Sequence, residues 1–176
     1  MNKAKKIICS IFARYFILII AALPNFFILY FIFTPLTIYP VYFILNLIFN
    51  ATLNGNVIYI RDYSASIELI KACIAGSAYY LLLIFNLSIP NIKFYKRMKM
   101  ICFAFVSFLI INVIRIASLS IIFVLKPDRF DIIHKLSWYI GSIVLVVLIW
   151  FIEVKKFNIK EIPFYSDVKS ISRYIK

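Results

Sequence analysis

The sequence predicts an all-α integral membrane protein: a helical bundle of about four transmembrane helices plus one short interfacial or re-entrant segment. The 176 residues are 64% hydrophobic and only 15% charged. The mean hydropathy is +0.97, and runs of about 20 apolar residues recur along the chain. A soluble core cannot absorb that much apolar surface. A helix of that length, in contrast, crosses the hydrocarbon layer and satisfies its own backbone hydrogen bonds.

The lengths of the apolar runs divide a single transmembrane domain, 1–176, into its elements. Four runs are long enough to span a bilayer, at about 11–33, 68–89, 100–125 and 132–152. The run 36–50 is shorter and lies between Pro35 and a polar turn, which favours an interfacial or re-entrant position. The turn Asn54-Gly55-Asn56 precedes a candidate extended piece at 57–63.

Clusters of Lys and Arg near the span ends predict the orientation in the cell membrane. They are Lys3, Lys5 and Lys6; Lys93, Lys96, Arg97 and Lys99; and Lys155, Lys156 and Lys160. Such clusters accumulate on the cytoplasmic side. Both termini and the tail 153–176 are therefore expected in the cytoplasm, and the segment 34–66 outside. The run 36–50 then cannot cross, because a crossing there would place the second cluster outside.

Composition excludes several classes of protein. The net charge of +13 does not indicate nucleic-acid binding, because the basic residues lie beside apolar runs, where they serve topology and contact anionic lipids. The cysteines Cys9, Cys73 and Cys102 are too scattered for a disulfide framework and lack metal-ligand spacing. With a single His in the chain, we expect neither a metal nor a cofactor.

Arg115 is the most informative polar residue, because it lies about 15 Å inside the third predicted span. An arginine at that depth costs at least a few kcal/mol and is by default functional or paired. A structural pairing with a carboxylate, a backbone carbonyl or a lipid phosphate is the alternative. Asn112 lies one turn earlier on the same helical face and is a candidate to orient the guanidinium.

Cys73 is the only cysteine that this topology places near the outer side, about 7–8 Å below the boundary. A lone cysteine usually packs as a small hydrophobe. Here Ser64 or Ser66 is expected to cap the helix and Glu68 to lie in its first turn, which favours thiolate character. The small residues 75–78 are expected to allow a partner helix to pack closely, so that Arg115 and His134 come near Cys73.

His134 begins the last predicted span at the same level as Cys73. A histidine at a membrane boundary is more often an ordinary interfacial residue. Beside the one outward cysteine, it is a candidate general base or acid. Cys and His together are the minimum for an activated thiol nucleophile, and Arg115 could stabilise an oxyanion.

These residues resemble, in order and spacing, the Cys, Arg and His signature of the exosortase/archaeosortase family. The matching pieces are Ala72-Cys73, the stretch 112–116 that contains Arg115, and His134. The stretch 71–80 is most similar to the small archaeal members called pacearchaeosortases. The resemblance extends over about 67–167, including 161–167 in the tail. The chain differs from the larger members in its length and in lacking the Ser-Gly that often follows their catalytic cysteine.

The resemblance implies a membrane cysteine peptidase or transpeptidase with its active site near the extracytoplasmic face. Its partners would be membrane-anchored proteins that end in a sorting signal: a short motif, a transmembrane helix and a basic tail. Cys73 would form a thioester, His134 would transfer protons, and Arg115 would stabilise the oxyanion. The nucleophile that accepts the cleaved substrate from the thioester is a lipid, a glycan or water, and the sequence does not distinguish these three.

Two other functions remain open on sequence grounds. One is a non-catalytic membrane scaffold or small transporter component in which Arg115 is a structural anchor. The other is a thiol-based lipid acyltransferase that uses the same residues with a lipid acyl donor.

Overall fold

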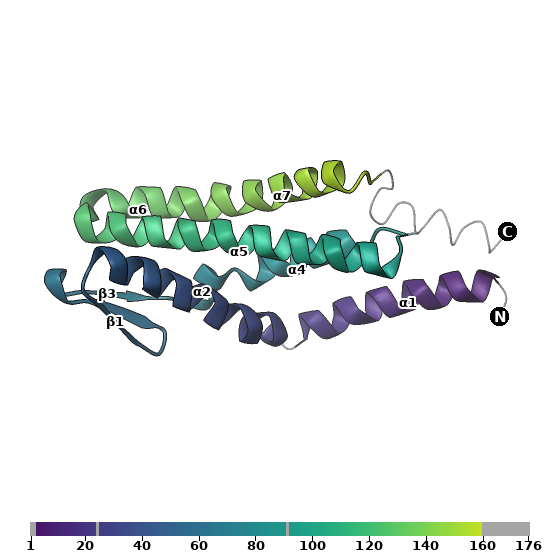
Figure 1. The fold of residues 1–176 in the computed structure, drawn as a ribbon, viewed down its shortest axis with the longest axis horizontal. Coiled ribbons are helices and arrows are strands. Elements are labelled where there is room, and N and C mark those ends of the chain that lie inside the picture. Colours follow the sequence, from purple (N-terminus) through teal and green to yellow (C-terminus); the bar gives the residue numbers. More distant parts are fainter. Residues whose placement is uncertain (1–2, 24, 91, 160–176) are drawn as a thin grey trace.

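The computed structural model describes residues 3–23, 25–90 and 92–159, and all structural statements refer to these (Figure 1). The predicted tail therefore lies mostly outside the described residues, together with Lys160 and the stretch 161–167. The helices are α1 (Lys3–Ala22), α2 (Phe27–Ile48), the single turn α3 (Lys71–Ile74), α4 (Gly76–Leu87), α5 (Phe94–Leu125), α6 (Pro127–Leu136), the π-helical turn η2 (Ser137–Gly141) and α7 (Ser142–Lys156). The strands are β1 (Ala51–Asn54), β2 (Val57–Ile60) and β3 (Ala65–Glu68), with the short 3₁₀ turn η1 (Arg61–Tyr63) between the last two.

The helices form an elongated bundle around α5, which contacts α2, α4 and α7 (Figure 1). The strands lie at the end of the bundle where α5 finishes and α6 begins. The opposite end carries the start of α1, the connection from α4 to α5 and the end of α7. The basic clusters that the structure describes therefore share one end of the molecule.

The helical, apolar character is confirmed, but the count of four spans is not. Among the described residues, two helices are long and apolar enough to cross a membrane, Phe27–Ile48 and Phe94–Leu125. A third span results if Pro127–Tyr139 and Ser142–Lys156, bent by 42°, are taken together. The apolar part of α1, Ile11–Ala22, and the stretch Lys71–Leu87, which contains α3 and α4, are shorter. At 1.5 Å per residue they extend roughly 18 and 26 Å, less than the ~30 Å hydrocarbon layer.

The predicted boundary between the first span and the short segment is wrong. The run 11–33 is interrupted where Asn25 and Phe26 adopt positive φ angles of 50° and 58°. The predicted interfacial segment 36–50 instead belongs mostly to α2, one continuous helix of 22 residues. Pro35 and Pro40 lie inside α2 without ending it. Such prolines are tolerated in membrane helices, where neighbouring groups satisfy the freed carbonyls.

The expectation of an all-α fold is corrected by a small antiparallel sheet with the order β1-β2-β3. Gly55, at φ 59°, provides the left-handed residue in the connection between β1 and β2. The expected extended piece at 57–63 is confirmed over 57–60. Ile58 and Ile60 on the inner face are buried, whereas Tyr59 between them is exposed. Ile58 and Ile60 thereby pack into the hydrophobic core that the helices form.

An aromatic cluster holds α2, α4 and α5 together. The rings of Phe33 and Tyr79 stack with their centroids 3.6 Å apart. Phe105 and Phe108 meet Tyr79 edge-on at 5.5 and 4.8 Å. Tyr79 is fully buried, so it is a packing residue of the core.

Two buried arginines tie the far end of α4 to its neighbours. Nη1 of Arg14 in α1 donates to the carbonyls of Leu87 and Ile89, at 2.8 and 3.0 Å. Arg97 in α5 donates to the same two carbonyls and to that of Asn86. The last carbonyls of a helix have no partner within the helix, and here the guanidinium groups satisfy them.

Gly76, the first residue of α4, packs directly against the ring of Tyr30 in α2. A Cβ atom there would lie 2.7 Å from Cζ of Tyr30, which is too short for any real contact. We expect Gly76→Ala to destabilise the protein by about 1–3 kcal/mol through overpacking, and Gly76→Ala/Tyr30→Leu to recover part of the loss. The measurement is the melting temperature of the detergent-solubilised protein.

Gly141→Ala is the matched control, because the nearest atom to its new Cβ is Ser137 Oγ at an ordinary 3.6 Å. An equal loss of stability in both glycine variants would contradict the close approach of α2 as the cause.

Candidate functional site

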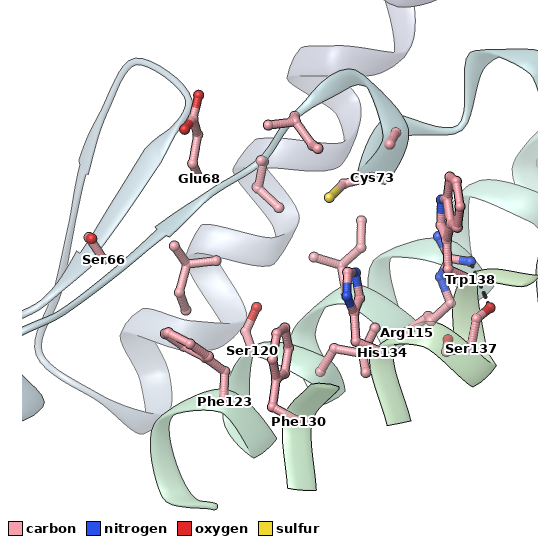
Figure 2. A pocket seen from close by; sticks show the side chains of 16 residues that line it. Ser66, Glu68, Cys73, Arg115, Ser120, Phe123, Phe130, His134, Ser137 and Trp138 are labelled. Carbon is pink, nitrogen blue, oxygen red and sulfur yellow. Dashed lines mark hydrogen bonds between the residues drawn. The ribbon is translucent and has the colours of Figure 1, made fainter. Parts of the chain in front are cut away.

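A cavity of about 440 Å³ opens at the end of the bundle that carries the sheet (Figure 2). Its walls come from β3 and the residues after it, α3, the last third of α5, α6 and η2. The lining residues are Ser66, Ile67, Glu68, Leu69, Ile70, Ala72, Cys73, Arg115, Ile116, Leu119, Ser120, Phe123, Phe130, His134, Ser137 and Trp138. Three predicted site residues, Cys73, Arg115 and His134, are among them.

Cys73 lies half-buried in the single turn α3, with its sulfur directed toward the cavity (Figure 2). Its backbone N–H donates to the carbonyl of Ile70 at 2.9 Å. The predicted cap is wrong: Ile70 occupies the N-cap position without a side-chain hydrogen bond, while Ser66 and Glu68 belong to β3. The chain therefore reaches the single turn α3 from a strand, and not from an earlier turn of the same helix.

The backbone is strained directly after α3. Ala75 has a φ of 58°, a left-handed conformation that costs an L-residue on the order of 1–2 kcal/mol. It separates α3 from α4, so the predicted span 68–89 is not one helix. Strained residues of this kind persist where the surrounding packing fixes them and often accompany functional sites.

Asn112 holds the turn that carries Cys73. Its Nδ2 donates to the Cys73 carbonyl at 3.0 Å, reaching across from α5. Asn112 is fully buried and does not line the cavity. No hydrogen bond joins it to Arg115 among the described residues, so its expected role in orienting the guanidinium is not observed.

Arg115 crosses from α5 to the bend between α6 and α7. Its Nη1 donates to Ser142 Oγ at 2.6 Å and, more weakly, to the carbonyl of Ser137 at 3.5 Å. Within the described part of the chain, its Nε is buried without a hydrogen-bond partner. One side of the guanidinium is therefore anchored at the bend, while the buried Nε–H has no partner among the described residues.

Sequence reasoning missed both serine partners, because each lies at an end of the π-helical turn η2. A π-turn shifts the helical register, so spacing by 3.6 residues does not reveal which side chains face Arg115. The predicted span 132–152 gave no signal of this bend.

His134 projects from α6 into the cavity and points to the side where Cys73 lies (Figure 2). Its ring stacks on Phe130, one turn earlier, with centroids 5.0 Å apart and planes 9° apart. No hydrogen bond to the imidazole occurs among the described residues. The stacking ring of Phe130, which the sequence analysis did not single out, therefore restrains the plane of His134.

The other two cysteines are exposed and lie elsewhere, Cys9 in α1 and Cys102 near the start of α5. In the described ranges no group of three or more His, Cys, Asp and Glu residues could hold a metal ion. The residues present can thus supply a thiol, an imidazole and a guanidinium to one cavity. This combination fits acyl transfer.

Fold and cavity together define a mainly helical protein with at least two helices able to cross a membrane, and with a thiol-containing cavity at one end of the bundle. Comparisons of the chain with models of protein families, with characterised proteins and with solved structures found no match.

Proposed function

We propose that the protein is a membrane-embedded cysteine peptidase or transpeptidase of the sorting type. Its substrates are membrane-anchored proteins with a C-terminal motif, a transmembrane helix and a basic tail, as the resemblance to the exosortase/archaeosortase family implies. The observation that carries the proposal is the meeting of Cys73, Arg115 and His134, from three separate helices, at one cavity. Most of the other residues that line this cavity are apolar, so a thiol, a guanidinium and an imidazole that meet there from distant parts of the sequence point to chemistry.

The distribution of charge supports an extracytoplasmic site. The start of α1, the start of α5 and the end of α7 carry Lys residues at one end of the bundle, and the cavity lies at the other (Figure 1). Basic residues favour the cytoplasmic side. The cavity then faces outward, where anchored substrates present the segment before their helix.

The chemistry proceeds in two balanced steps. The Cys73 thiolate, its proton taken by His134, attacks the carbonyl carbon of a peptide bond just outside the substrate helix. The oxyanion that forms accepts a hydrogen bond from the guanidinium of Arg115, which lines the cavity. The C–N bond breaks, His134 returns the proton to the leaving amine, and a thioester remains on Cys73.

In the second step the acceptor attacks the thioester and restores the thiol. The acceptor loses one proton to His134 as its oxygen or nitrogen bonds to the acyl carbon, the C–S bond to Cys73 breaks, and His134 passes that proton to the departing thiolate. A lipid, a glycan and water all satisfy this balance.

One observation favours the non-catalytic alternative. The bond of Arg115 to Ser142 ties α5 to α7, as expected for a structural anchor in a scaffold or transporter component. A lipid acyltransferase would also form a thioester on Cys73, but with a fatty acyl group instead of a protein.

The experiment that tests the proposal is the capture of an acyl-enzyme. Cells would express the protein with a tagged protein from the source genome that has the motif, helix and basic tail. We expect mass spectrometry to find a fragment of the tagged protein on Cys73, and neutral hydroxylamine to release it because hydroxylamine cleaves thioesters. A fatty acyl group at Cys73 would establish the acyltransferase instead, and an unmodified Cys73 with an uncleaved partner would favour the scaffold.

A further inference from the structure

The strand β3 has one open edge. The strand order places β3 at the side of the sheet, paired only with β2 among the described residues. The N–H of Leu69 donates to the carbonyl of Asn56 at 2.9 Å. Because hydrogen-bonded pairs alternate in an antiparallel ladder, the main-chain groups of Ser66 and Glu68 point away from β2. Two N–H and two C=O groups are therefore available along this edge.

The open edge borders the cavity that contains Cys73. Successive side chains of a strand point to opposite faces of the sheet, yet the three consecutive strand residues Ser66, Ile67 and Glu68 all line the cavity. A cavity against one face would touch only every second residue. The cavity therefore meets β3 along its edge, beside the free main-chain groups.

We infer that this edge of β3 binds the extended segment of the substrate that immediately precedes its transmembrane helix, as a fourth strand of the sheet. The inference rests on the proposed function and adds to it how the substrate is held. Main-chain hydrogen bonds to an exposed edge are a general mode of peptide recognition. They fix an extended backbone in place, so its carbonyl is presented at a constant position to a nucleophile.

The direction of the bound segment follows from the course of the chain. β3 leads within a few residues to the turn that carries Cys73, so a segment running parallel to β3 brings its last carbonyl to the thiol. A second hollow of about 290 Å³ shares Ala72 and Trp138 with the first, and Ala75, Ser77 and Ala78 also line it. Small residues admit a close helix, so the hollow fits the start of the substrate helix.

The first test compares Ser66→Pro with Ser66→Ala. Proline removes an N–H that points away from β2, so the existing ladder is kept, whereas alanine keeps that N–H. The probe is a synthetic peptide in bicelles that contains the motif, helix and basic tail of a candidate substrate. We expect thioester formation on Cys73 to be about fivefold or more slower in Ser66→Pro than in Ser66→Ala, the effect of one net hydrogen bond. Equal rates in the two variants would overturn the inference.

The second test leaves the protein unchanged, so it decides the matter even if the proline variant does not fold. The same peptide is N-methylated at one amide at a time before the cleaved bond. A strand uses every second amide for pairing on one side, so we expect the rate of thioester formation to fall with a period of two residues. A rate that is insensitive to methylation or falls evenly would reject strand pairing and leave the proposed function standing. No thioester from the unmethylated peptide would instead remove the proposed function itself.

Discussion

Cys73→Ala is expected to abolish processing of the tagged substrate, with a loss of at least roughly a thousandfold, while the protein accumulates normally. The reason is that no other described residue lining the cavity carries a thiol. His134→Ala should lose nearly as much. Because residues that act as one unit are not additive, the double variant should be barely worse than Cys73→Ala alone. The measurement is substrate cleavage in cells, normalised to the amount of each variant in the membrane.

Cys9→Ala and Cys102→Ala are the matched controls, since both cysteines are exposed and lie outside the cavity. Both should process the substrate like the wild type. Wild-type processing by Cys73→Ala would remove the enzyme hypothesis and leave the scaffold in its place.

Arg115→Lys is expected to reduce processing by roughly a hundredfold to a thousandfold, the typical cost of losing an oxyanion donor. Lysine keeps the positive charge but loses the planar fork. It can still reach one hydroxyl acceptor, so membrane accumulation should fall much less than activity. The readouts are the rate of thioester formation and the yield of protein in the membrane.

Ser142→Ala separates the catalytic role of Arg115 from the structural one. It removes the shortest hydrogen bond of the guanidinium and leaves the guanidinium itself in place. If Arg115 serves catalysis, Ser142→Ala should keep most of the activity that Arg115→Lys loses. If both variants instead fail to accumulate, Arg115 is an anchor between α5 and α7, and the oxyanion role is wrong.

Local chain features misled the sequence analysis in two regions. The position of Pro35 predicts the end of a span, but a membrane helix tolerates proline, and α2 continues past it. Ser64 or Ser66 is expected to cap a helix that begins at about residue 68, but residues 65–68 pair with β2 and form the strand β3. Strand pairing depends on a partner elsewhere in the chain, so propensity alone did not reveal it.

The sequence by itself determined the helical, apolar class and the candidates Cys73, Arg115 and His134, because hydropathy and the cost of a buried charge are properties of single segments and residues. Only the tertiary structure decided that these three meet at one cavity, that Asn112 holds the Cys73 carbonyl and not the guanidinium, and that Ser142 receives the guanidinium. These contacts join elements distant in the sequence. The left-handed Ala75 and the π-turn η2 interrupt the helices, and β3 interrupts the helical pattern at the edge of the sheet. These interruptions set the directions of the side chains that meet at the cavity, and no periodic sequence pattern encodes those directions.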